Sequence, residues 1–181
     1  MVFPALSDKS LTDLLIGSVG HRMSLGDLLQ REGAKACVSI PSVVVDMDAV
    51  AVDNAGSEIP SSVDMVFGCE GNRVQLAECK YRVGGSGKQR KKLTPPSENE
   101  FKSKVADTRA LLQSAEYTNL APTLAILFAD NHIEQAKAWV NDYNAGKKQP
   151  LYEAMTTAEF FSTFFPADKG LAKFCSTQFS L

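Results

Sequence analysis

The sequence predicts an α/β domain in which helices flank a mixed central sheet. Two short runs of alternating apolar residues between positions 63 and 83 indicate a β-hairpin. The continuous apolar run at 123–129 is suited to a strand that is buried on both faces. Residues that favour helix starts precede most of the other apolar segments. The predicted order is therefore helix, three strands, helix, strand and further helices.

The length of the chain bounds its organisation. With 181 residues, of which 44% are hydrophobic, it can form one domain with a sizeable core. We expect a single domain over residues 1–181, with its core at about 10–145 and a helical extension at about 150–181.

Two short helices are predicted in the N-terminal third. Ser10 can cap a segment at 11–16, and Ser24 can cap a second segment at 25–31 that ends at Gly33. Serine side chains accept hydrogen bonds from the free N–H groups of a first turn, and glycine adopts the left-handed conformation that ends many helices. Both helices precede the first predicted strand.

The segment at 43–52, VVVDMDAVAV, predicts that first strand. It is rich in β-branched residues and alternates in polarity. The alternation places Asp46 and Asp48 on one face of the strand. With the hairpin, this segment gives three consecutive strands.

The hairpin at 63–83, VDMVFGCEGNRVQLAECKYRV, can form in two registers. A two-residue Gly-Asn turn pairs Asp64 with Cys79 and puts the apolar rows of the two strands on opposite sides of the sheet. A three-residue loop at 70–72, with one residue at positive φ, pairs Asp64 with Glu78 instead. We expect the second register, because burial of large apolar side chains, at about 1.5–3 kcal/mol each, outweighs a turn preference.

This register gathers charged side chains at one point. Successive side chains on a strand project to opposite faces, so Glu78 and Lys80 project the same way. If the apolar faces of both strands share one core, Asp64 lies on the side of Glu78 and Lys80. Two carboxylates and an ammonium around one point are what metal-assisted phosphodiester cleavage requires.

The spacing of these residues resembles a known signature. Asp64, thirteen residues and then Glu78-Cys79-Lys80 are similar to the PD-(D/E)XK motif of restriction-endonuclease-like nucleases, with Val63 where that family often has proline. The resemblance implies the αβββαβ core of the restriction-endonuclease-like fold. The order of elements predicted from periodicity and helix caps agrees with it.

The resemblance also implies roles for these residues. Asp64 and Glu78 would bind Mg²⁺ or Mn²⁺ with help from a backbone carbonyl near Cys79, since hard cations prefer oxygen ligands. Lys80 would orient or help to deprotonate the attacking water and offset charge that develops in the transition state. The other interpretation is a solvent-exposed Glu-Lys pair on an amphipathic hairpin, which contributes about 0–1 kcal/mol.

Members of this family often carry a further acid on the first helix, facing the metal site. Glu32, at the end of the helix before the first strand, is the best-placed candidate for this additional catalytic residue, and Asp27 is the second. Asp46 and Asp48 can also reach the site from the first strand. The alternative for each of these acids is a solvated surface residue without a role in catalysis.

The family also often places a basic or amide residue on the helix after the third strand, where it can touch a phosphate. Four residues of the helix expected there qualify, and the motif does not choose among them. They are Lys102, Lys104, Arg109 and Gln113.

Positive charge is concentrated directly after the candidate site, although the net charge of the chain is −2. Six of the 19 Lys and Arg residues lie at 80–94, a segment without an acid. The glycines and prolines at 83–96 indicate a mobile loop around them. A polyanion approaching the site would meet this segment first, and phosphate contacts supply sequence-independent affinity. We expect a nucleic-acid-binding wall formed by Lys88, Arg90, Lys91, Lys92, Lys102 and Lys104.

Three helices are predicted in the second half of the chain. Each begins with a polar cap residue followed three positions later by glutamate, a capping-box pattern. The three pairs are Ser97 with Glu100, Asn131 with Glu134, and Thr156 with Glu159. The last helix, at 157–165, carries four phenylalanines at helical spacing, which indicates a packing face.

Neither a membrane span nor a signal peptide is indicated, and we expect a cytoplasmic protein. Four cysteines are scattered along the chain without a CxxC pair, which is typical of reduced thiols and disfavours a zinc site. They are Cys37, Cys69, Cys79 and Cys175.

Together these features predict a small metal-dependent nuclease that hydrolyses phosphodiester bonds, with DNA as the expected substrate. Sequence specificity would come from loops, from a second subunit of a homodimer or from an accessory protein. The alternative is a catalytically silent domain of the same fold that binds nucleic acid or protein. A third possibility, a different enzyme or a toxin or immunity module, would make the motif a coincidence.

Overall fold

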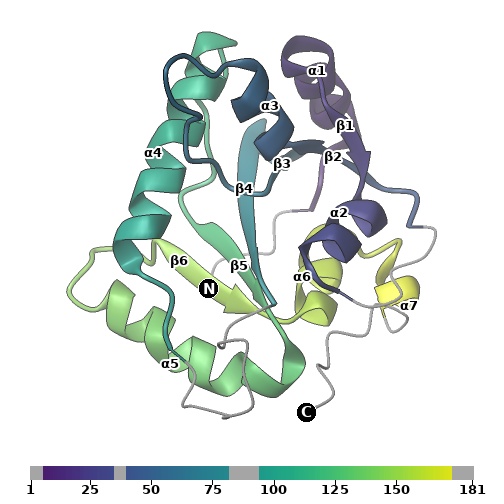
Figure 1. The fold of residues 1–181 in the computed structure, drawn as a ribbon. Helices are drawn as coiled ribbons and strands as arrows, with labels where there is room; N and C mark the ends of the chain where they lie inside the picture. The colour runs from purple at the N-terminus through teal and green to yellow at the C-terminus, as the bar shows by residue number, and fades with distance from the viewer. Residues whose placement is uncertain (1–5, 35–39, 82–93, 173–181) are drawn as a thin grey trace.

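The computed structural model describes residues 6–34, 40–81 and 94–172, which form an α/β fold with an open six-stranded mixed sheet flanked by helices (Figure 1). The strands are β1 (Arg22–Ser24), β2 (Val43–Asp46), β3 (Met65–Cys69), β4 (Arg73–Lys80), β5 (Leu124–Phe128) and β6 (Tyr152–Met155). The helices are α1 (Lys9–Val19), α2 (Leu25–Glu32), α3 (Met47–Asp53), α4 (Glu98–Ser114), α5 (Ile133–Asn144), α6 (Thr157–Phe164) and α7 (Lys169–Ala172), with a 3₁₀ turn at Asp130–His132.

The strands lie in the sheet in their order along the chain. Strands β1 to β4 are antiparallel neighbours, whereas β5 runs parallel to β4 and β6 runs parallel to β5. Parallel neighbours need a crossover connection, and α4 and α5 supply the two crossovers. Residues of α2 and α6 pack on one face of the sheet, and residues of α1, α3, α4 and α5 pack on the other.

The hairpin of β3 and β4 has the predicted register. Cys69 pairs with Arg73 around a three-residue loop, and the same register carried back along the strands places Asp64 opposite Glu78. Two loop residues have positive φ, rather than the one expected. The register therefore brings the two acids together as burial of the apolar rows requires.

Both faces of this hairpin are buried, which corrects the expectation of one apolar and one charged face. Met65 and Phe67 pack on the side of α2 and α6, as expected. Val66 and Leu76 pack on the opposite side, with residues of α1 and α4. Glu78 is also buried, at 1% exposed. Central strands that are covered by helices on both faces leave neither face to solvent.

The strand predicted at 43–52 is wrong in its second half, which is helical. Strand β2 ends at Asp46, and α3 follows directly. The Asp46 carboxylate caps this helix by accepting a hydrogen bond from the N–H of Ala49. Asp46 and Asp48 therefore do not share a strand face. The buried residues of α3 recur at helical spacing and are Met47, Val50 and Ala51.

The two edge strands, β1 and β6, are additional to the predicted elements. Strand β6 pairs in parallel with β5, so the region at 150–181 is not only the helical extension that we expected. These strands have three and four residues. Segments of that length are too short for an alternating pattern to identify.

The two N-terminal helices lie where they were predicted. Helix α1 begins two residues earlier than expected, at Lys9, and its cap is Asp8 rather than Ser10. Helix α2 is capped by Ser24 and ends at Gly33, which has left-handed φ and ψ, as predicted. The side chain of Asp8 accepts a hydrogen bond from the first turn, so an acid replaces the expected serine in the same role.

Of the three predicted capping boxes, one is present. The capping box of Thr156 and Glu159 at the start of α6 is confirmed. Ser97 occupies the cap position of α4 but makes no side-chain cap hydrogen bond, and Glu100 instead accepts a hydrogen bond from a lysine on β4. Helix α5 follows the 3₁₀ turn and is not capped by Asn131.

Aromatic rings fill the core between the sheet and α6, as predicted. The ring centroid of Phe67 on β3 lies 5.8 Å from that of Phe160, 5.3 Å from Phe164 and 4.9 Å from Phe165. These rings fix the centre of the hairpin against α6, and therefore hold the strands that carry the candidate site.

Two of the cysteines, Cys69 and Cys79, are free and buried, as predicted, whereas Cys37 and Cys175 lie outside the described residues. Among the helices of the described ranges, none is both long enough and apolar enough to cross a membrane.

Candidate active site

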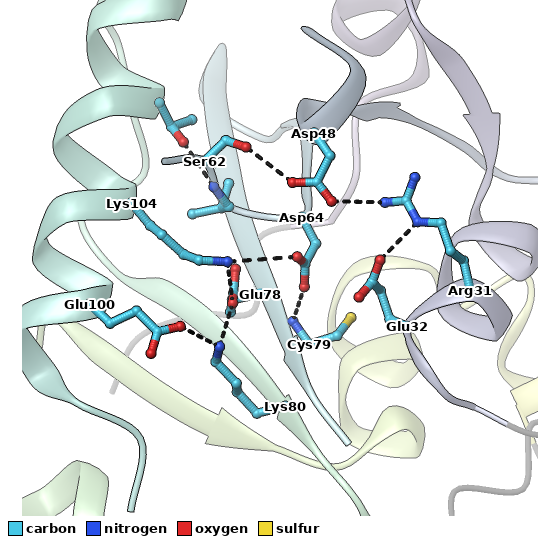
Figure 2. A network of polar contacts seen from close by, with 12 residues as sticks. Arg31, Glu32, Asp48, Ser62, Asp64, Glu78, Cys79, Lys80, Glu100 and Lys104 are labelled. Atoms are coloured by element: carbon cyan, nitrogen blue, oxygen red, sulfur yellow. Dashed lines mark hydrogen bonds and ion pairs between the residues drawn. The ribbon is translucent and has the colours of Figure 1, made fainter. Parts of the chain in front are cut away.

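Asp64 lies at the entrance to β3, the first strand of the central hairpin. Its side chain is buried, and its Oδ2 accepts a hydrogen bond of 2.6 Å from the backbone N–H of Cys79 on β4 (Figure 2). Its own carbonyl oxygen accepts a hydrogen bond of 3.1 Å from the N–H of Met47 on α3. Asp64 is thus fixed between the hairpin and the start of α3.

Glu78 lies on β4 beside Asp64 and is held by two lysines. Its Oε1 is 2.9 Å from the Nζ of Lys80 and 2.7 Å from the Nζ of Lys104. Its Oε2 is buried and has no hydrogen-bond partner among the described residues. A buried carboxylate oxygen without a partner is costly, which marks this position as one where a cation or a donor can be accommodated.

Lys80, the last residue of β4, projects to the same side as Glu78, as predicted. Besides Glu78, its Nζ donates a hydrogen bond of 2.7 Å to Glu100 on α4. Burial lowers the pKa of Lys80, but the carboxylates of Glu78 and Glu100 raise it by more, so its pKa is above the ordinary value. Lys80 is therefore protonated at neutral pH.

Lys104 on α4 reaches both buried acids. Its Nζ lies 2.7 Å from Oε1 of Glu78 and 3.9 Å from Oδ1 of Asp64 (Figure 2). Burial lowers its pKa and the Glu78 carboxylate raises it by more, so the pKa of Lys104 is also above the ordinary value. The structure thus places Lys104 beside the two buried acids, and its role in a nucleic-acid-binding wall stays a prediction.

The other candidates on α4 do not contact these acids. Lys102 is exposed and forms an ion pair of 3.2 Å with Glu98 on its own helix. Arg109 and Gln113 are exposed as well. Of the four basic or amide residues that the sequence left open, the structure brings only Lys104 to the site.

Three acids from three elements form a compact cluster. Glu32 at the end of α2, Asp48 in the first turn of α3 and Asp64 each offer a carboxylate oxygen, and these oxygens lie within 4.8 Å of one another. The Ser62 hydroxyl donates a hydrogen bond of 3.2 Å to Asp48. Asp27, the second candidate on α2, is exposed and is not a member of the cluster.

Arg31 ties part of this cluster together from one side. Its Nε is 2.8 Å from Glu32, its Nη1 is 2.5 Å from Asp46 and its Nη2 is 3.4 Å from Asp48. Burial lowers the pKa of Arg31, but its hydrogen bonds to Asp46 and Glu32 raise it by more, so its pKa is above the ordinary value. Asp46, at the end of β2, is thus a helix cap and an ion-pair partner of Arg31, and it is not a member of the cluster of three acids.

Burial governs the ionisation of the acids. Burial first, and the neighbouring Glu78 carboxylate second, raise the pKa of Asp64 to about 8, although the hydrogen bond from the N–H of Cys79 lowers it. Burial also raises the pKa of Asp48, against the hydrogen bond from Ser62. Such acids bind a proton or a metal ion readily, because either one offsets the charge that burial disfavours.

Cys79 contributes its backbone to the site, and its thiol stays protonated. Burial raises the pKa of the thiol well above the ordinary value, and the neighbouring acids Asp64 and Glu78 raise it further. The contact with Asp64 is made by the N–H of Cys79. That a carbonyl near Cys79 serves as a metal ligand stays a prediction.

Four of the predicted nucleic-acid-binding residues belong to the basic segment after β4. Lys88, Arg90, Lys91 and Lys92 fall at 82–93, outside the described residues. Their role in binding nucleic acid stays a prediction, and so does that of Lys102.

The sequence interpretation missed Arg31 and Glu100 as members of the site. Glu100 and Lys104 are four residues apart on α4 and therefore share one helix face, a signal that could have placed both beside Lys80. Arg31 carries no comparable signal, because its partners come from three different elements.

Comparisons of the chain with protein-family models, with curated proteins and with solved structures found no significant match. The functional interpretation of the site therefore depends on the chemistry and arrangement of its own residues.

Proposed function

We propose that this protein is a metal-dependent nuclease with a restriction-endonuclease-like, PD-(D/E)XK core, which hydrolyses phosphodiester bonds. One observation carries the proposal: two buried acids, Asp64 and Glu78, meet two protonated lysines. Two further acids, Glu32 on α2 and Asp48 on α3, lie beside Asp64. Buried charges are disfavoured by desolvation, and such clusters concentrate at functional sites.

The donor set fits a hard divalent cation, Mg²⁺ or Mn²⁺. Glu32, Asp48 and Asp64 offer carboxylate oxygens, the ligands that these ions prefer. The buried Oε2 of Glu78, which has no hydrogen-bond partner among the described residues, can accept a hydrogen bond from a water molecule or another donor bound there. A bound divalent ion would supply positive charge beside the phosphate and a water of lowered pKa.

The lysines complete the site on the side of β4 and α4. Because its pKa is raised, Lys80 is protonated and can orient a water molecule or a phosphate oxygen by donating hydrogen bonds, but it cannot take up a proton. Its ammonium can also offset negative charge that develops on the phosphate in the transition state. This role differs from that of a general base.

The substrate part of the proposal depends on charge. The basic segment at 80–94 begins with Lys80 itself, so a polyanion bound there would lie beside the acids and lysines of the site. We propose DNA as this polyanion, and a homodimer or an accessory subunit as the source of any sequence specificity.

Nicking of supercoiled plasmid DNA with Mn²⁺ or Mg²⁺ tests the proposal. We expect metal-dependent nicking by the wild type that EDTA abolishes, and a loss of about 100-fold or more in Asp64→Asn and Lys80→Met, because each removes an electrostatic contact to the reacting groups. Glu32→Gln should lose activity in the same way. Asp27→Asn, a change of the same charge on the same helix but outside the cluster, should nick like the wild type.

Equal nicking by the wild type and Asp64→Asn would assign the activity to a contaminant and contradict the proposal. The Lys80→Met variant tests the proposal separately from metal binding. The Lys80 ammonium is no ligand for a cation, and its removal should nevertheless reduce nicking as severely as the change at Asp64.

The second candidate is a catalytically silent domain of the same fold. One observation favours it: Lys80 and Lys104 both contact the same oxygen of Glu78, which makes a locally satisfied ion-pair network. This candidate predicts that DNA is bound but not cut, and that binding is the same for the wild type and Asp64→Asn.

A further inference from the structure

Lys104 lies between two acids that a second divalent ion would have to share. Its Nζ is 2.7 Å from Glu78 and 3.9 Å from Asp64, and its side chain is only 18% exposed (Figure 2). Metal–oxygen distances for Mg²⁺ and Ca²⁺ are about 2.0–2.6 Å, so an ion that bridged Oδ1 of Asp64 and Oε1 of Glu78 would need the space of this ammonium. Two cations at such close range also repel each other.

The structure fixes Lys104 in this place through the rest of α4. One turn further along the helix, the Thr108 hydroxyl accepts a hydrogen bond of 3.0 Å from the N–H of Val63, the residue before Asp64. The Asp107 carboxylate accepts another of 3.0 Å from the N–H of Ser61. Helix α4 is therefore anchored to the segment that carries Asp64, and Lys104 is held at a set distance from it.

The other side of Asp64 has a different arrangement. Glu32 and Asp48 offer oxygens within 4.8 Å of each other and of Asp64. Figure 2 shows Arg31 beyond Glu32 and Asp48, on their side away from Asp64. Glu78 does not belong to this cluster of three acids. The room for a divalent ion is thus on the side of α2 and α3, and the lysine side is already supplied with positive charge.

We propose that Lys104 is the built-in second cation of this site, so that the protein takes one divalent ion, on Glu32, Asp48 and Asp64. Glu78 then anchors the two lysines instead of binding that ion. This inference rests on the metal centre of the proposed function and adds to it the number of ions and the residue that sets the number.

Equilibrium binding of Mn²⁺, followed by the electron paramagnetic resonance signal of free Mn²⁺, measures the number directly and needs no activity. We expect one ion per chain for the wild type. Glu78→Gln should still bind that ion. Asp48→Asn should lower the affinity for Mn²⁺ by about 10-fold or more, as the loss of even an indirect metal contact does.

Removal of the lysine provides the sharper half of the test. Lys104→Ala should bind two Mn²⁺ ions, because the position between Asp64 and Glu78 is opened, and the double variant with Glu78→Gln should return to one. Lys102→Ala removes the same charge from the exposed face of α4 and should bind one ion. Lys104→Arg keeps the charge and should also bind one.

Each outcome decides between the possibilities. Two ions on the wild type, one ion on folded Lys104→Ala, or loss of the ion in Glu78→Gln would overturn the inference while the metal centre stands. Should Lys104→Ala not fold, the numbers of Mn²⁺ ions bound by the wild type and by Glu78→Gln still test the inference. No Mn²⁺ bound to the wild type would overturn the metal centre itself, and the inference with it.

Discussion

Asp64 is the residue in which folding and the proposed chemistry conflict most directly. Its carboxylate is buried beside a second acid, and a single backbone N–H donates to it within hydrogen-bond distance among the described residues. The ionised form is therefore disfavoured in the fold, and a proton or a metal ion relieves the conflict. The unfolded chain, in which Asp64 is solvated, has no such conflict.

This conflict makes the stability of the metal-free protein depend on pH. Because the folded pKa of Asp64 is raised from 3.8 to about 8, the folded state holds a proton that the unfolded state has lost between these values. The free energy of unfolding in EDTA should thus fall as pH rises, by up to about 1.4 kcal/mol per pH unit from this residue. Urea denaturation at several pH values between the two pKa values measures the slope.

The matched variant for this test is Asp64→Asn, which keeps the shape of the side chain and cannot ionise. Its unfolding free energy should vary less with pH over the same window, and it should be the more stable protein at the upper end. An identical slope in the wild type and Asp64→Asn would show that Asp64 ionises normally in the fold.

At the scale of elements, the close packing of α1 on β3 depends on a glycine, Gly68, which has no side chain. A Cβ atom added at Gly68 would lie 2.5 Å from the Cβ of Leu11 and 2.8 Å from the carbonyl oxygen of Asp8. The N–H of Gly68 also donates a hydrogen bond of 3.0 Å to the Thr12 hydroxyl. The helix therefore approaches the strand so closely that only glycine fits there.

Gly68→Ala should accordingly destabilise the protein by about 1–3 kcal/mol, because the added methyl group forces backbone and core side chains apart. Urea denaturation measures the change. The control is Gly17→Ala within α1, where nothing lies within 4 Å of the added Cβ. Alanine is favoured over glycine in helix interiors by about 0.5–1 kcal/mol, so this variant should be more stable than the wild type. Equal effects of the two changes would contradict the close approach.

At the scale of the whole molecule, the chain combines a small negative net charge with one strongly basic segment. The net charge is −2, whereas the segment at 80–94 contains six basic residues and no acid. Such an asymmetry favours a polyanion that binds at one place and is repelled elsewhere.

If that polyanion is DNA, its affinity should fall steeply with salt, and the segment should account for the slope. Replacing Lys88, Arg90, Lys91 and Lys92 by alanine should reduce the slope of log Kd against log salt by up to about 0.9 for each phosphate that is no longer neutralised. Fluorescence anisotropy with a labelled duplex at several salt concentrations measures it. Alanine at Lys9 and Lys169, two lysines outside the segment, should leave the slope unchanged.

The sequence by itself determined the features that depend on neighbours along the chain. Asp64 and Glu78 come together because alternation and burial select one hairpin register, and the register is local to twenty-one residues. The caps of α2 and the capping box of α6 could also be predicted from the sequence, since each cap and its partner lie within one helical turn.

Only the tertiary structure decided which side chains complete the site. Lys104 was one of four equivalent candidates until the docking of α4 against the segment before β3 selected it. Asp48 belongs to the cluster because β2 ends at Asp46 and α3 follows. The alternating pattern at 43–52 gave no sign of this change from strand to helix. These contacts join segments far apart in the chain, and the packing of helices on the sheet, rather than any local pattern, sets which of them meet.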